Sequence, residues 1–132
     1  MRIAPDTNVL VRALTGDDPK QSALAEAALE TADRLALSTV ALCELVWLLS
    51  KGYRIARPDL IAALEDLLGA DKVDVDRPAA DAGLAALKAG ADFADGVIAL
   101  EGLRLGADTF LSFDRKAVRL LQDAGQPAQL LA

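Results

Sequence analysis

The chain has 132 residues, of which 53% are hydrophobic, and it carries a net charge of −6 with one cysteine and no histidine. This length and composition predict one domain spanning residues 1–132 and exclude a disordered chain. A lone cysteine excludes an intrachain disulfide, and without a long apolar run we expect a cytoplasmic protein that does not span a membrane. The lack of histidine excludes a Ser-His-Asp triad and a His-ligated zinc site, which leaves carboxylates, lysine, hydroxyls and oxygen-bound metals for catalysis.

Strand and helix patterns alternate along the chain. The first half predicts a strand over 2–5, helices over 8–14 and 19–31, a strand over 34–38, an apolar helix from Ser38 or Thr39 to near Gly52, and a helix over 59–68. The second half predicts a strand over 72–75, a helix over 78–88, a helix starting at Asp95, a strand over 107–112, a helix over 115–123 and an edge strand over 128–131. This alternation favours parallel βαβ units. We therefore expect a three-layer α/β/α domain with a central, mainly parallel sheet of four to five strands.

Glu44 is the only charged residue between Leu35 and Ser50. It lies in a helix that is apolar almost all round, a pattern typical of a buried helix. A buried carboxylate without a partner is strongly unfavourable, and no Lys or Arg lies one helical turn away. Either Glu44 lies on a narrow exposed strip, or it pairs with a distant basic residue, or it binds a metal ion.

Three other acids precede helices: Asp6, Asp95 and Asp114. Each alone is explained by helix capping, since Asp is a preferred N-cap residue. Asp6 and Asp114 directly follow strands, which places them at the carboxyl edge of the sheet, where α/β proteins bind ligands. Asp92 lies three residues before Asp95, a spacing that lets both acids face one place.

Carboxylates gathered at one edge repel one another, and Mg²⁺ or Mn²⁺ relieves that repulsion because hard cations prefer oxygen ligands. Such a site suits phosphodiester hydrolysis, in which the metal activates water and stabilises developing charge. Thr7, Asn8 and Ser112 are candidates for holding the carboxylates by hydrogen bonds, although ordinary turn and cap bonding explains Thr7 and Ser112 equally well.

Five basic residues are candidates for RNA phosphate contacts, although solvated surface charge is the simpler interpretation of each: Arg12, Lys51, Arg54, Arg57 and Arg115. A net acidic chain is not typical of a general nucleic-acid-binding protein unless metal ions neutralise its acids. Trp47 is interpreted as part of the core or of a dimer interface.

Four stretches resemble the PIN-domain ribonucleases, most closely the VapC toxins of VapBC toxin–antitoxin pairs: Asp6-Thr7-Asn8-Val9-Leu10-Val11-Arg12, Glu44 in its apolar helix, Asp92-Phe93-Ala94-Asp95 and Ser112-Phe113-Asp114. The resemblance implies a PIN-like fold and an Mg²⁺- or Mn²⁺-dependent endoribonuclease. Asp6, Glu44, Asp95 and Asp114 would then bind the metal, with Asp92 as an additional catalytic acid. It also implies a homodimer and a VapB-like antitoxin as partner. Pro5 and Gly96 depart from the family pattern, and Gly96 is expected to loosen the helix start after Asp95.

A receiver-like, phospho-accepting signalling domain is the alternative, because it also gathers Asp residues and Mg²⁺ at a sheet edge. It requires an acidic pair after the first strand, whereas Thr7 and Asn8 follow Asp6 here, and it leaves Glu44 without a role. A phosphatase of the haloacid-dehalogenase type requires Asp-x-Asp at that place and is excluded by Asn8. RNA cleavage with Mn²⁺, set against labelling by acetyl phosphate, distinguishes the nuclease from the receiver.

Overall fold

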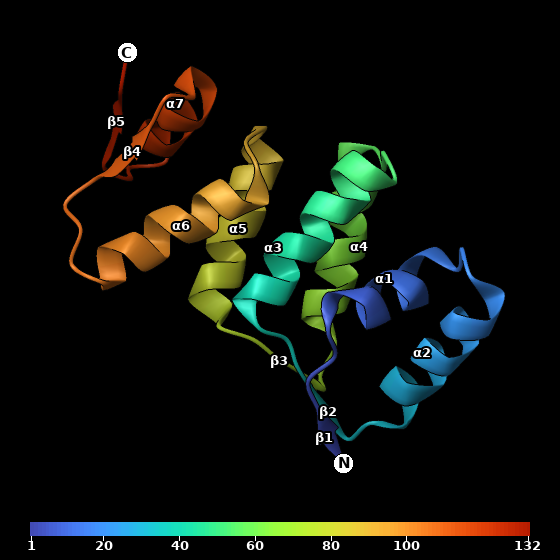
Figure 1. The fold of residues 1–132 in the computed structure, drawn as a ribbon. Coiled ribbons are helices and arrows are strands. Elements are labelled where there is room, and N and C mark those ends of the chain that lie inside the picture. Colours follow the sequence, from blue (N-terminus) through green and yellow to red (C-terminus); the bar gives the residue numbers. More distant parts are fainter. The chain divides into compact units, whose positions relative to one another are not determined.

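The computed structural model describes residues 1–132, which divide into two compact units (Figure 1). Unit 1 comprises Met1–Asp76 and unit 2 comprises Arg77–Ala132. None of the helices combines the length and the apolar character needed to cross a membrane.

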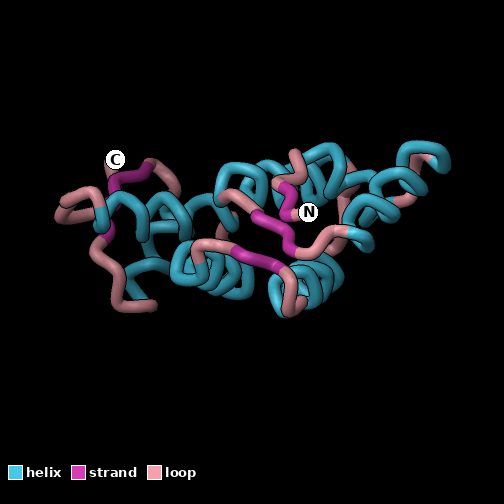
Figure 2. Tube along the Cα trace, turned by 90° about the horizontal axis from the view of Figure 1, so that it is seen from below, coloured by secondary structure: helices cyan, strands magenta, loops and turns pink.

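Unit 1 is built on a small parallel sheet. Its elements are β1 (Arg2–Ile3), α1 (Thr7–Thr15), α2 (Pro19–Thr31), β2 (Arg34–Ala36), α3 (Thr39–Trp47), a π-helical turn over Leu48–Gly52, α4 (Arg57–Gly69) and β3 (Val73–Asp74). The strands run in the order β1-β2-β3, and Leu35 of β2 lies opposite Ile3 on one side and Val73 on the other. Figure 2 shows these three strands side by side. Each strand is shorter than predicted, and Pro5 lies outside β1, because proline has no N–H for the ladder.

The helix starts at Asp18 and Ser38 and the helix end at Gly16 confirm the sequence predictions. Asp18 caps α2 with Pro19 at the first helical position, and Ser38 caps α3 through its side-chain oxygen. Gly16 ends α1 in the left-handed conformation with a φ of 66°, which glycine adopts without a Cβ clash. Local capping chemistry therefore decides where these helices begin and end.

Leucine side chains from α1, α3, the π-helical turn and α4 form the core of unit 1. Six of them are at most 1% exposed: Leu10, Leu42, Leu45, Leu49, Leu60 and Leu64. The prediction that the apolar helix is buried all round is wrong. Val40 and Trp47 are 67% and 62% exposed, and Glu44 is exposed between them. An apolar sequence permits burial of every face, but within unit 1 α3 packs against α1 and the π-helical turn and leaves this strip open.

Unit 2 holds the remaining elements: α5 (Arg77–Ala89), α6 (Phe93–Arg104), β4 (Phe110–Ser112), α7 (Arg115–Asp123) and β5 (Ala128–Leu130). β4 and β5 pair in parallel, with Phe110 opposite Ala128. Side chains of α6, α7 and the two strands form a shared core: Ala99, Phe110, Val118, Leu121, Ala128 and Leu130. The five predicted strands are thus present and parallel, and they form one sheet of three and another of two.

Two glycines allow α5 and α6 to approach closely. A Cβ added to Gly96 would lie 2.2 Å from the backbone oxygen of Ala82, and one added to Gly83 would lie 2.7 Å from the ring of Phe93. Both contacts are closer than a real Cβ tolerates. The expectation that Gly96 loosens the start of α6 is therefore wrong, because this glycine is what lets the first turn of α6 pack against α5.

Candidate active site

Asp6 links β1 to α1 in unit 1 and is exposed. Its backbone is extended, with φ −77° and ψ 174°, and its Oδ1 accepts a hydrogen bond from the Val9 N–H at 3.0 Å. Asp6 is therefore the N-cap of α1. The cap uses one carboxylate oxygen, and the other has no hydrogen bond in the structure.

Thr7 and Asn8 follow Asp6 in the first turn of α1. Thr7 is buried and Asn8 is exposed, and neither side chain donates to the Asp6 carboxylate. Asn8 lies beside Asp6 on the wall of a groove of about 350 Å³ between α1 and α2. Asn8 is therefore available to a ligand in this groove, whereas burial restricts Thr7.

Glu44 lies on α3, which packs against α1. It makes no hydrogen bond or ion pair, and it shares its exposed strip with Val40 and Trp47. Among the three interpretations of Glu44, the structure agrees with the one that places it on an exposed strip. Because Glu44 is exposed, its carboxylate does not need a metal ion to offset the cost of burial. The exposed carboxylate is nevertheless accessible to a metal ion. Trp47 is not a core residue.

Arg12 belongs to a network that the sequence analysis missed. Its Nε donates to Gln21 Oε1 at 2.7 Å and its Nη1 donates to Asp17 Oδ1 at 3.1 Å. The hydroxyl of Tyr53 donates to the other oxygen of Asp17 at 2.6 Å. The network joins α1, the α1–α2 loop and the end of the π-helical turn, so Arg12 already has protein partners and is a poor candidate for RNA contact.

In unit 2, Asp92 and Asp95 mark the start of α6. Asp92 is the N-cap residue, but its side chain makes no capping hydrogen bond. Asp95 lies in the first turn and is half-buried, and its N–H donates to the Asp92 backbone oxygen at 3.1 Å. The Asp92 carboxylate is thus not engaged by the helix that it precedes.

The pKa of Asp95 is raised above its ordinary value. Burial is the largest cause, followed by the negative charge of Asp92, and the charge of Asp114 adds to the rise. A backbone hydrogen bond at Asp92 acts in the opposite direction. The negative charges of Asp92 and Asp114 therefore both disfavour the charged form of Asp95.

Asp114 caps α7 and is exposed. Its Oδ1 accepts from the N–H groups of Lys116 at 3.0 Å and Ala117 at 3.1 Å. Ser112 accepts from the Asp114 N–H through its Oγ at 3.0 Å. Ser112 therefore orients the backbone of Asp114 and does not contact its carboxylate.

The predicted metal ligands supply oxygen atoms only, which is the donor type that Mg²⁺ and Mn²⁺ prefer. None of these acids is engaged by a Lys or Arg side chain. The charges of Asp92 and Asp114 contribute to the raised pKa of Asp95. The donor chemistry therefore fits a hard divalent cation. No group of three or more acidic or cysteine side chains is close enough together in this structure to hold a metal ion.

A comparison with known protein families identifies the family of the chain. The family model of the PIN domain matches residues 3–121, which extend through both units. No curated protein is similar enough in sequence to count as a match. The predicted α/β fold class with parallel strands is confirmed, and PIN domains are generally nucleases. Because the match covers most of the sequence, the chain belongs to the PIN domain family.

Proposed function

We propose that this PIN domain is a metal-dependent endoribonuclease and the toxin of a type II toxin–antitoxin pair. The observation that carries the proposal is Asp95, a half-buried carboxylate that lies near the charges of Asp92 and Asp114 and has no basic partner. Carboxylates with a raised pKa and no basic partner are enriched at functional sites, which supports a role for Asp95 as a metal ligand.

Asp6, Glu44, Asp95 and Asp114 would hold Mg²⁺ or Mn²⁺, with Asp92 as an additional acid. When bound, the cation neutralises the carboxylates and activates water for attack on the phosphodiester. The chain contributes orientation: backbone N–H groups hold one oxygen of Asp6 and one of Asp114, so each carboxylate keeps its other oxygen for the ion. In this proposal, residues 1–132 form a single domain. The protein acts on RNA in the cytoplasm.

Two partners belong to the proposal, a second copy of the chain and a VapB-like antitoxin. The exposed side chains of Val40 and Trp47, on one strip of α3, support a homodimer, because exposed large apolar groups favour an interface. Static light scattering at micromolar concentration tests this part, and a monomer would contradict it. An antitoxin that covers unpaired carboxylates is expected to present an Arg to them.

The nuclease is tested by incubating the purified protein with end-labelled structured RNAs, including tRNAs, with and without Mn²⁺. We expect internal cuts that require the metal and are absent in Asp95→Asn. Asp18→Asn is the matched control, because Asp18 caps α2 and has no proposed part in the site. Cleavage by Asp95→Asn at the wild-type rate would contradict the proposal.

A further inference from the structure

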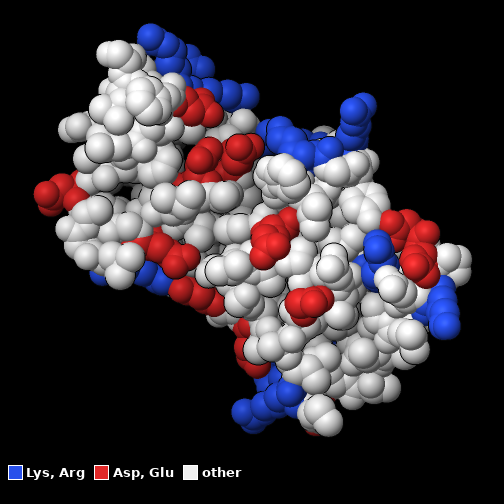
Figure 3. Space-filling view, viewed as in Figure 1, with Lys and Arg blue, Asp and Glu red and all other residues white.

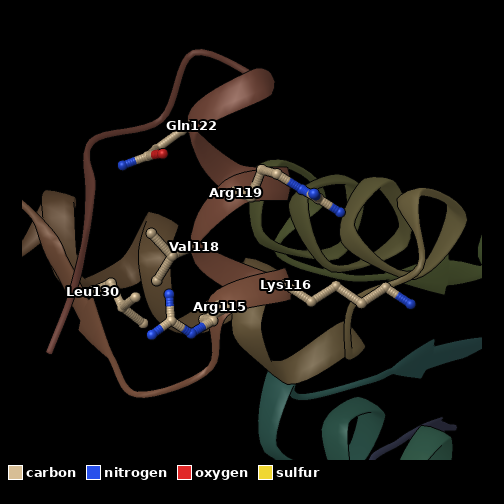
Figure 4. A pocket seen from close by; sticks show the side chains of 6 residues that line it. All are labelled: Arg115, Lys116, Val118, Arg119, Gln122 and Leu130. Atoms are coloured by element: carbon tan, nitrogen blue, oxygen red, sulfur yellow. The ribbon is translucent and has the colours of Figure 1, made fainter. Parts of the chain in front are cut away.

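One face of α7 is lined with cations. Arg115, Arg119 and Gln122 follow one another at helical spacing around a cavity of about 530 Å³. Lys116 and the apolar side chains of Val118 and Leu130 complete its lining (Figure 4). We call this group of residues the α7 cationic face.

The three cations of this face are exposed and make no ion pair or hydrogen bond through their side chains. Asp114 precedes Arg115 directly, yet its carboxylate accepts from backbone N–H groups rather than from the guanidinium. In Figure 3, Lys and Arg side chains gather where α7 lies in Figure 1. Their charge is therefore not neutralised within the protein.

Arg115 and Lys116 also stand where a helix disfavours positive charge. They are the first and second residues of α7, and the N-terminus of a helix carries a partial positive charge. No basic residue occupies the last turn, where a cation would be stabilising. Cations that oppose the helix dipole and lack a partner indicate a ligand outside the chain rather than a contribution to folding.

We propose that the α7 cationic face binds the phosphodiester backbone of the RNA substrate next to the cleaved bond. The proposal rests on the nuclease function above. A guanidinium donates two parallel hydrogen bonds to a phosphate, which suits Arg115 and Arg119. Val118 and Leu130 form the apolar part of the same cavity lining.

The position of the face favours RNA over an acidic protein segment. Arg115 adjoins Asp114 in the chain, so a phosphate held there lies next to one of the proposed metal ligands. Lys116 extends toward the loop before α6, since a Cβ on Gly90 would lie 3.3 Å from its Nζ. That loop leads to Asp92, so the lysine also lies on the side of the proposed acids.

The test compares two double variants made in the full chain with Asp95→Asn, so that labelled RNA stays intact with Mg²⁺. Arg115→Gln with Arg119→Gln removes the arginines of the face. Lys20→Gln with Arg77→Gln removes the same charge from exposed sites elsewhere. By fluorescence anisotropy we expect at least about a tenfold loss of affinity for single-stranded RNA in the first double variant. For this variant, the slope of the logarithm of the binding constant against the logarithm of the salt concentration should become shallower by about 0.7 for each lost phosphate contact.

The control double variant should bind within about twofold of its parent, and the melting temperature of the α7 variant should not fall, because cations leave a helix N-terminus. Equal weakening in both doubles, or a lower melting temperature in the α7 variant alone, would overturn the proposal. So would unchanged RNA binding together with lost binding of poly-glutamate, which would assign the face to an acidic protein.

Cleavage by the chain with Asp95 intact is assayed in parallel, which separates the two proposals. If that chain cleaves RNA and the α7 variant binds it normally, only the inference about α7 fails. If RNA binding depends on the α7 arginines but the intact chain never cleaves, the nuclease function fails and the α7 cationic face stands as an RNA-binding surface.

Discussion

Two groups of neighbouring charged side chains in unit 2 lack the ion pairs that two arginines of unit 1 make. In unit 1, Arg12 pairs with Asp17 at 3.1 Å, and Arg34 contacts Asp74 through two hydrogen bonds of 2.7 and 2.8 Å. In unit 2, two groups of charges have no ion pair: the acids Asp92, Asp95 and Asp114, and the cations Arg115, Lys116 and Arg119. Charges that a fold leaves unpaired side by side are available to ligands of opposite sign, here a metal ion and a phosphate.

The same difference appears in proton affinity. The pKa of Asp17 is lowered, first by the hydrogen bond from Tyr53, with the charge of Arg12 acting in the same direction. The pKa of Asp95 is raised, first by burial and then by Asp92. One carboxylate is stabilised by its surroundings when charged, and the other is destabilised.

The largest expected effect concerns whether unit 1 takes part in the chemistry at all. Asp6→Asn and Glu44→Gln should each reduce RNA cleavage at least about 100-fold, since loss of groups that merely support metal ligands already costs up to that much. Asn caps helices about as well as Asp, so Asp6→Asn should keep its melting temperature. Initial rates and thermal melts check both statements, with Asp59→Asn as control. Full activity in Asp6→Asn and Glu44→Gln would confine the site to unit 2.

A large loss of stability is expected where unit 2 depends on close backbone packing. Gly96→Ala places a Cβ against the Ala82 carbonyl and should lower the free energy of unfolding by about 1–3 kcal/mol. That corresponds to roughly 4 °C in melting temperature for each kcal/mol.

Gly102→Ala is the matched control in the same helix. Its nearest neighbour would lie at an ordinary 3.9 Å, so the gain in helix propensity should leave stability equal or higher. Equal melting temperatures for Gly96→Ala and the wild type would show that α5 and α6 separate easily.

Metal binding should relieve the repulsion in unit 2. Mn²⁺ at 100 times its dissociation constant stabilises the folded chain by about 2.7 kcal/mol if it binds only the native state. We expect the melting temperature of the wild type to rise with millimolar Mn²⁺ and that of Asp6→Asn to rise much less, with Asp18→Asn responding as wild type does. Calorimetric scans with and without EDTA measure this, and equal shifts in all three would argue against a site that includes Asp6.

The smallest expected effect is that one substitution in each unit changes the melting temperature at pH 7 in opposite directions. Because the folded pKa of Asp95 is raised, its stabilising contribution is complete below the unfolded pKa and is lost as pH rises through the folded value. Asp95→Asn should therefore raise the melting temperature at pH 7 without metal and not at pH 3. The pKa of Asp17 is lowered, so its contribution is present above the unfolded pKa and is lost as pH falls through the folded value. Asp17→Asn should therefore lower the melting temperature at pH 7. Shifts of the same sign at pH 7 would contradict the comparison.

The sequence by itself determined the features that depend on neighbours along the chain. The Asp18-Pro19 helix start, the Ser38 cap and the α7 boundaries were predictable, because capping joins a side chain to a backbone N–H two or three residues away. The parallel strands and the PIN family followed from the alternation of elements and from the acidic motifs in order. The same motifs identify Asp6, Glu44, Asp95 and Asp114 as candidate metal ligands, and their assembly into one metal site stays a prediction.

Only the tertiary structure decided which faces are covered and which charges are paired. The exposure of Glu44, the partnership of Arg12 with Asp17 and Tyr53, and the contact of Gly96 with α5 all depend on segments that meet in space. The three cations of α7 can be counted in the sequence, but the cavity that they line with Leu130 exists only once β5 lies beside α7. Burial and repulsion are properties of three-dimensional neighbours, and residue periodicity along one helix does not specify them.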